Sequence, residues 1–460
     1  MDATLLVSAW EALTLQLALA FTVPTARTWQ QIALGWVLHR GAATVTGIFR
    51  ALGTLADRHW TVYHKFFYRA AWALEELSAS LLRQVILPMI IESGALEAAT
   101  GRPVVDLNID DTTAARYGKH VAHAGWFKDA SASGPATKGR VIHWAHNWLV
   151  GAITLRLPRW AMTRWVLPVV FALYRKRDDC DSKHPFATHA QLAGRMIQQA
   201  RHALPPEVLI RVAADGAYAT RQMILGLPAG VSLVSRIRRD AAIYALPPKR
   251  RPTGKRGASP KKGKRLPVPT KLAARRKTGW RTVTLLKQGR TVQRQILGIT
   301  CLWYHVCRSQ PIRLVIVRDP TGRQDDDFLF CTDATVPDEQ IVQRFYDRWG
   351  VEECIWEAKQ QLGFEDTRGW CSRTVNRQAP LAMVLVSMVK AWFAKAALDE
   401  PGLLPEAVPW NQAKTRPSFA DMLSALRRVL WLHRISPIST LTGRVRGILK
   451  ALTQALFAAA

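Results

Sequence analysis

The segment Val104–Thr112, with the sequence VVDLNIDDT, decides the fold of this 460-residue chain. Its β-branched and apolar residues predict a buried strand, and Asp110 and Asp111 stand at its C-terminal end. A second strand of this kind is expected at Val208–Ala213, followed by Asp215. A helical pattern lies between the two, so the order strand, helix, strand predicts an α/β fold. Both strands then present carboxylates at their C-terminal ends, where the active sites of α/β proteins form.

A third carboxylate lies on a predicted helix, Phe345–Gly363, with the sequence FYDRWGVEECIWEAKQQLG. Its residues Arg348, Glu352 and Lys359 are separated by four and seven positions, which return to nearly the same side of a helix. The neighbouring Glu353 lies about 100° away from that face. Taken alone, this pattern is also typical of an amphipathic surface helix with ion pairs between successive turns.

The chain is strongly basic, with 64 Lys and Arg against 34 Asp and Glu and a net charge of +30. This balance predicts a polyanionic partner, nucleic acid first and an anionic membrane second. Residues 241–318 contain 20 Lys or Arg and no acidic residue, so their counter-charge must come from solvent ions or a phosphate backbone. Within them, residues 247–277 are rich in Pro, Gly, Lys and Arg and are expected to form a mobile basic loop.

Cysteine usage and apolar runs both indicate a cytoplasmic protein without a membrane partner. The six cysteines include no C-x-x-C pair and do not form a disulfide framework, so a reducing compartment is expected. The apolar runs Trp160–Tyr174 and Leu381–Leu398 are interrupted by Arg164 and Lys390. Neither is an unbroken span of about 20 residues, and we predict no transmembrane helix.

The first 100 residues predict helices, including one at Trp29–Leu38 and a basic, aromatic one at Trp60–Leu87. The turn between them ends at Gly53 and gives this region the outline of a helix-turn-helix, with an ordinary helical bundle as the alternative. After the first acidic strand, another strand is expected at His120–Phe127.

The three acidic motifs together resemble the DDE transposases of bacterial insertion sequences. They are NIDDTT around Asp111, AADGAY around Asp215, and an aromatic residue followed at fixed spacing by Arg, Glu and Lys in the predicted helix. The signature of the family begins with tyrosine, whereas Phe345 holds that position here and Tyr346 follows it. The interval from Asp215 to Glu352 leaves room for the β-rich insertion found in one group of these enzymes.

This resemblance implies an RNase-H-like mixed-sheet core of the α/β class with an inserted β-rich subdomain, a helical N-terminal DNA-binding region and a helical C-terminal region. The expected boundaries are 1–100 for the N-terminal region, 101–236 for the first part of the core, 237–311 for the basic insertion, 312–400 for the second part of the core and 401–460 for the C-terminal region.

The resemblance also implies that Asp111, Asp215 and Glu352 bind two Mg²⁺ ions, for which Mn²⁺ can substitute. Arg348 and Lys359 would then contact phosphates near the scissile bond. Asp110 is the rival of Asp111, since adjacent strand residues face opposite sides, and the motif favours the acid directly before the threonines. The other expected DNA contacts are Tyr346, Lys249, Arg250, Arg251, Lys261 and Lys262.

The implied reaction is cut-and-paste transposition by a nucleoid-associated bacterial enzyme. The protein would bind the terminal inverted repeats of its element, cleave phosphodiester bonds and transfer the 3′ ends to target DNA. Its partners would be double-stranded DNA and a second copy of the chain. A catalytically inactive DNA-binding derivative and a structure-directed nuclease on the same fold are the alternatives.

Overall fold

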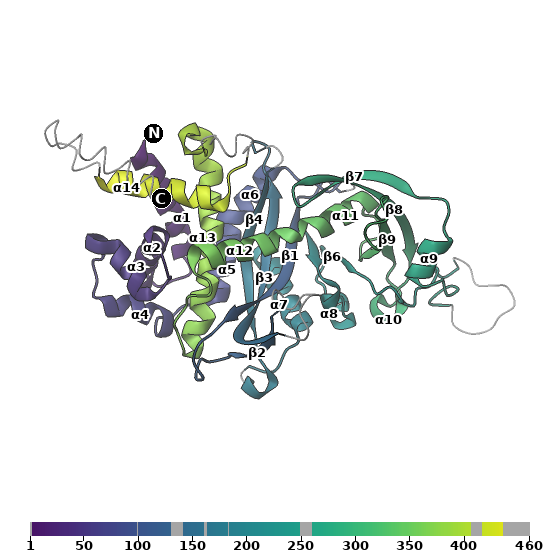
Figure 1. Cartoon of the computed structure of the whole chain (residues 1–460), viewed down its shortest axis with the longest axis horizontal. Helices are drawn as coiled ribbons and strands as arrows, with labels where there is room; N and C mark the ends of the chain where they lie inside the picture. The colour runs from purple at the N-terminus through teal and green to yellow at the C-terminus, as the bar shows by residue number, and fades with distance from the viewer. Residues whose placement is uncertain are drawn as a thin grey trace.

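The computed structural model describes residues 2–98, 100–129, 141–160, 163–182, 184–248, 260–405 and 416–435. In this part of the chain, ten strands form one mixed sheet with helices packed around it (Figure 1). The strands are β1 (Val104–Ala115), β2 (Gly125–Lys128), β3 (Ile142–Arg156), β4 (Arg164–Tyr174), β5 (Leu209–Ala214), β6 (Val231–Arg236), β7 (Arg281–Lys287), β8 (Arg290–Cys301), β9 (Ile312–Arg318) and β10 (Asp327–Cys331).

The helices are α1 (Ala3–Ala18), α2 (Val23–Leu38), α3 (Val45–Leu52), α4 (Trp60–Tyr68), α5 (Leu74–Ser80), α6 (Leu87–Ser93), α7 (His189–Ala203), α8 (Arg221–Leu225), α9 (Pro269–Arg275), α10 (Tyr304–Cys307), α11 (Asp338–Asp347), α12 (Trp349–Leu362), α13 (Ser372–Asp399) and α14 (Phe419–Ile435). Short helical turns are η1 (Gly53–Leu55), η2 (Leu81–Ile86), η3 (Arg177–Asp179), η4 (Gly216–Tyr218) and η5 (Pro401–Leu403).

The centre of the sheet has the strand order β4-β3-β1-β5-β6. Strand β1 pairs antiparallel with β3 and parallel with β5, and β5 pairs parallel with β6. Helices lie on both faces of these strands, with α7 packed on β3 and β4 and α12 packed on β1, β3 and β4. This confirms the predicted class, a mixed α/β protein with the arrangement of an RNase-H-like core.

The predicted β-rich insertion continues the central sheet. Beyond β6 the sheet order runs β10-β9-β8-β7, all antiparallel. Helix α11 covers one face of this extension, and a separate apolar cluster lies beneath it. The cluster is made of Val234, Leu285, Ile296, Val315, Val317, Leu329, Cys331, Val336, Ile341, Val342, Phe345 and Tyr346. The boundaries between the expected regions stay predictions.

The single helix expected at Trp60–Leu87 is divided into α4, α5, η2 and α6. The physical reason is a buried cation at the end of α4. Arg377 of α13 donates hydrogen bonds to the carbonyl oxygens of Phe66 and Phe67, at 3.3 and 3.2 Å. Those carbonyls lie at the C-terminal end of α4, where a helix leaves its acceptors unpaired, so the arginine stabilises a helix end at this point.

Two other expectations are also corrected. The basic stretch 247–277 was expected to be loop, but its last part forms α9, because Leu272 and Ala273 are apolar and pack into the core. Pro269 stands at the first helical position, where its fixed backbone angle suits a helix. The strand expected at His120–Phe127 is reduced to β2, which pairs with the beginning of β3.

Helix α13 is the apolar centre of the helical side of the molecule. Among the described residues it is long and apolar enough to cross a membrane, but 89% of its apolar window is buried inside the structure. It packs on β4, α12 and α14 and also contacts α1 and α4. These contacts are those of a core helix in a globular protein.

The helix expected at Phe345–Gly363 is formed by two helices, α11 and α12, which meet at Arg348. They run end to end across one face of the sheet (Figure 1). Helix α11 lies on the extension strands and α12 on β1, β3 and β4. The junction between them therefore lies near the place where the central strands meet the extension.

Candidate active site

Arg348, at the junction of α11 and α12, contacts two of the candidate acids. Its Nη1 donates to Asp110 Oδ2 on β1, and its Nη2 donates to Glu352 Oε1 at 3.1 Å. The side chains of Arg348 and Asp110 are 14% and 17% exposed, so this ion pair is largely shielded from solvent. The helix pair therefore brings Glu352 to the carboxylate of Asp110.

Asp215 lies on the same side of the sheet as Asp110. The parallel pairing of β1 with β5 aligns Ile109 with Ala214, and the next residues along the two strands are Asp110 and Asp215. Aligned residues of neighbouring strands point to the same face of a sheet. The Asp215 carboxylate is also within 3.8 Å of a guanidinium nitrogen of Arg236 on β6.

The pKa values show that Asp110 and Glu352 act on each other and that both act on Arg348. Burial raises the pKa of Asp110, and the adjacent Asp111 raises it further against the opposing effect of Arg348. Burial and the charge of Asp110 likewise raise the pKa of Glu352. Burial lowers the pKa of Arg348, but Asp110, Glu352 and Asp215 outweigh it and hold that pKa above its ordinary value. Arg348 thus contacts Asp110 and Glu352, and the charge of Asp215 acts on it without a direct contact.

Asp111 makes different contacts. The Tyr218 hydroxyl donates to Asp111 Oδ1 at 2.8 Å, and Asn147 Nδ2 donates to Oδ2 at 3.3 Å. Burial, followed by the charge of Asp111, raises the pKa of Tyr218, so its hydroxyl stays protonated. The structure therefore brings Asp110 to Glu352 and Arg348, where the sequence favoured Asp111.

Tyr218 and Asn147 were not among the residues predicted for the site. Tyr218 has a signal in the sequence, because it stands three residues after Asp215 in the AADGAY motif. Asn147 has none, since it lies in a mostly apolar strand and reaches Asp111 only through the pairing of β3 with β1.

Two of the predicted DNA contacts near the junction, Lys359 and Tyr346, lie in different surroundings. Lys359 donates to the carbonyl oxygen of Thr113 on β1 and pairs with Glu365, both at 2.8 Å. Tyr346 is only 7% exposed and packs in the apolar cluster under α11. Its phenol is not a surface group, and the expectation of a direct DNA contact finds no support in this geometry. The neighbouring Phe345 lies beneath the guanidinium of Arg348, 5.8 Å from ring centroid to cation.

The predicted basic contacts are only partly within the described residues. Lys261 is exposed, and the ammonium of Lys262 lies 4.1 Å from the ring centroid of Tyr244 and 4.9 Å from that of Tyr304. Lys262 is therefore held on the extension by two aromatic rings. The other expected contacts, Lys249, Arg250 and Arg251, lie outside the described residues.

The site has the donor set of a hard divalent cation. Within the described ranges, no group of three or more His, Cys, Asp and Glu side chains is close enough to hold a metal ion as it stands. The carboxylates of Asp110 and Glu352 nevertheless bind a cation already, the guanidinium of Arg348, and Asp215 lies on the same side of the sheet. Carboxylate oxygens are the ligands that Mg²⁺ and Mn²⁺ prefer, so the residues fit such an ion in kind and in charge.

Comparison with known proteins agrees with this geometry. The family model described as DDE superfamily endonuclease matches residues 16–295, more than half of the chain. The match contains Asp110, Asp111 and Asp215 and ends before α12. No curated protein matches the chain. A mixed sheet with flanking helices, acids on two adjacent strands and a match of this length agree, and the chain belongs to the DDE superfamily endonucleases, a family of nucleases that act on DNA.

Proposed function

We propose that this protein is a transposase that binds the terminal inverted repeats of its own element, cleaves phosphodiester bonds there and transfers the 3′ ends to target DNA. The observation that carries the proposal is the pairing of Asp110 and Glu352 with Arg348, with Asp215 placed beside Asp110 at the end of the neighbouring strand. Two adjacent strands and one helix supply the three acids, so the site depends on the whole core and not on one motif.

In this proposal the metal-binding acids are Asp110, Asp215 and Glu352, with Asp110 in the place first predicted for Asp111. Bound Mg²⁺ or Mn²⁺ would activate the attacking water or 3′ hydroxyl and stabilise the leaving oxygen. Asp111 hydrogen bonds with Tyr218 and would have no direct part in the reaction.

Arg348 is the residue best suited to contact the DNA backbone. Its Nη atoms are bound to Asp110 and Glu352, but its Nε is buried and has no hydrogen-bond partner among the described residues. A buried donor without an acceptor is costly, and this Nε could reach a phosphate oxygen only after the side chain moves. A divalent cation that took the two carboxylates would free the remaining donors for the same purpose.

The charge distribution supports DNA as the partner and the extension as a contact surface. The 20 cations of residues 241–318 have no acid among them, and the extension strands β7 to β9 with α9 and α10 carry many of them beside the core. The expectation that all these cations need solvent ions or phosphate is corrected for Arg281, Arg294, Arg313 and Arg318, which pair with acids between 319 and 339. Neutralisation of the others by phosphate would make DNA binding dependent on salt. Pairing of two element ends would require two copies of the chain.

A strand-transfer assay tests the proposal. The parent is incubated with labelled element ends, target plasmid and Mg²⁺, in parallel with Asp110→Ala, Asp215→Ala and Glu352→Ala. We expect cut and joined products from the parent and neither from the three variants. Cleavage without joining would support the structure-directed nuclease instead. DNA binding without any cleavage by the parent would support the inactive derivative.

A further inference from the structure

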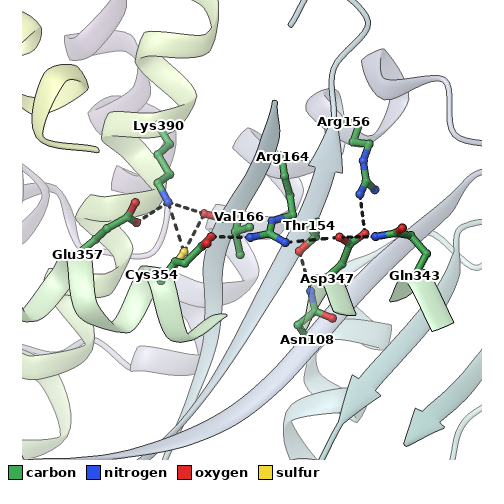
Figure 2. Close-up of polar contacts among 11 residues, drawn as sticks. Asn108, Thr154, Arg156, Arg164, Val166, Gln343, Asp347, Cys354, Glu357 and Lys390 are labelled. Carbon is green, nitrogen blue, oxygen red and sulfur yellow. Dashed lines mark hydrogen bonds and ion pairs between the residues drawn. The ribbon is translucent and has the colours of Figure 1, made fainter. Parts of the chain in front are cut away.

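Asp347, the last residue of α11, is bound by donors from three elements. Its side chain is only 4% exposed. Arg156 at the end of β3 donates to Oδ2 at 2.6 Å, whereas Arg164 of β4 and Gln343 of α11 donate to Oδ1 at 3.5 and 3.1 Å (Figure 2). A buried carboxylate with this many donors holds its place firmly. The end of α11, next to Arg348, is thereby fixed to β3 and β4.

Arg164 also binds the beginning of α12. Its Nη2 donates to Glu353 Oε2 at 2.6 Å, while its Nη1 contacts Asp347. Asp347 and Glu353 directly flank Arg348 and Glu352 in the sequence. One largely buried guanidinium, 16% exposed, therefore joins two acids on either side of the ion pair in the candidate active site.

Gly350 allows α12 to lie this close to β4. A Cβ at position 350 would be 2.6 Å from Val166 Cγ2 and 3.2 Å from Arg164 Nε. No side chain fits there unless the helix moves away from the strand. The first turn of α12 therefore rests directly on the residues that hold it.

A second attachment holds the middle of α12. Lys390 of α13 donates to Glu357 Oε2 at 2.5 Å and to the carbonyl oxygen of Val166 on β4 at 3.1 Å (Figure 2). Cys354 of α12 contacts the same carbonyl at 3.1 Å. Helix α12 is thus attached to β4 at two points, while the carboxylate of Glu352 itself is bound by Arg348 and Asp110.

We propose that Arg164 is a positioning residue for Glu352. By holding Asp347 and Glu353, it sets where the Glu352 carboxylate lies relative to Asp110 and Asp215, without touching substrate or metal itself. This inference rests on the proposed function, because it treats the three acids as the metal ligands. Arg164 interrupts an apolar stretch at the start of β4, and positioning Glu352 gives that charge a role.

Binding of Mn²⁺ to the full chain without DNA, followed by electron paramagnetic resonance of the free ion, tests the role directly. We expect Arg164→Gln to weaken Mn²⁺ binding about tenfold, as loss of the groups that orient metal ligands commonly does. Arg164→Lys should restore part of it, because an ammonium can still contact one of the two acids. Urea unfolding of each variant separates these effects from a general loss of structure.

Arg281→Gln is the matched control. Arg281 of β7 also bridges two acids of one helix, Asp338 and Glu339 of α11, at 3.2 and 3.0 Å. This variant should bind Mn²⁺ as the parent does. If Arg164→Gln, or Arg164→Lys in case the glutamine variant does not fold, also binds like the parent, Arg164 does not position Glu352.

Glu352→Gln distinguishes failure of this inference from failure of the proposed function. If Glu352→Gln binds Mn²⁺ as tightly as the parent, Glu352 is not a metal ligand and the assignment of the site is at fault. If Glu352→Gln loses binding and Arg164→Gln does not, only the positioning role is overturned. A parent chain that binds no Mn²⁺ would overturn both.

Discussion

The two faces of β1 carry opposite chemistry. On the face toward α11 and α12 three successive side chains are polar: Asp106 pairs with Arg344, Asn108 bonds to Thr154, and Asp110 pairs with Arg348. On the other face Val105, Leu107 and Ile109 are buried apolar residues, and only Asp111 at the end is charged. One strand thus supplies a row of charged and amide groups to the helix pair and an apolar surface to the opposite layer.

The two acids therefore differ in their surroundings. Burial and a neighbouring carboxylate disfavour the charged form of Asp110, whereas the carboxylate of Asp111 accepts two hydrogen bonds. Asp110 is buried beside Asp111 and Glu352, and its pKa is raised. Such a site costs folding free energy, which is typical of places built to bind a cation. Asp111 accepts hydrogen bonds from Tyr218 and Asn147, and the proposal gives it a structural role. In the proposal, neighbouring residues of one motif therefore serve opposite purposes.

The largest effect is expected on the rate of DNA cleavage, which should distinguish Asp110 from Asp111. Asp110→Asn should slow cleavage of labelled element ends by about 10³-fold, because it removes a metal-binding carboxylate. Asp111→Asn should slow it by no more than about tenfold, as is common for groups outside the ligand set. DNA affinity, measured by fluorescence anisotropy, checks that both variants still bind. The reverse order of rates would return the catalytic role to Asp111.

A smaller effect, on the free energy of unfolding, is expected when the partner of Asp111 is changed. Tyr218→Phe removes the 2.8 Å hydrogen bond from a buried hydroxyl to Asp111, which should lower the free energy of unfolding by about 1–2 kcal/mol. Cleavage by the folded variant should change little. Urea unfolding and the cleavage assay, run on the same preparation, measure both. A large loss of cleavage with unchanged stability would show that Asp111 belongs to the reacting site.

The alternation of β1 bears on the choice between the two acids. In VVDLNIDDT the residues alternate, with Asp106, Asn108 and Asp110 on one face and the apolar residues on the other. That alternation places Asp110 with the polar face, whereas the resemblance of the motif favoured Asp111. The prediction used the alternation to say that only one of the two acids faces the site, and it followed the motif in choosing Asp111.

The class of fold was predictable because it depends on local patterns. Strands β5, β6 and β9 and helix α7 each follow from their own apolar spacing, and the acids at strand ends mark the edge where a site forms. The division at Arg348 and the end of α4 were not predictable, since both depend on side chains from distant parts of the chain. Arg377 binds a carbonyl oxygen of α4, and Arg164 binds Glu353 of α12, each from a distant part of the sequence. No local pattern in the sequence reveals these contacts.

The smallest expected effect concerns stability without metal. Because burial and Asp111 raise the pKa of Asp110 above its ordinary value, the folded state binds its proton more tightly than the unfolded state does. The parent should therefore lose stability as pH rises from the ordinary range of a carboxyl through the raised pKa. Asp110→Asn carries no such charge, so it should match the parent near pH 3 and be more stable than the parent at pH 7.5.

Urea unfolding in EDTA across this pH range measures the difference, with Asp111→Asn as the control. That variant loses a hydrogen-bonded acceptor beside Tyr218 and should be no more stable than the parent at any pH. If Asp110→Asn is instead less stable than the parent at pH 7.5, the ion pair with Arg348 outweighs the cost of burying the carboxylate. Asp110 would then be a structural partner of Arg348, and the contrast between the two faces would not mark the metal site.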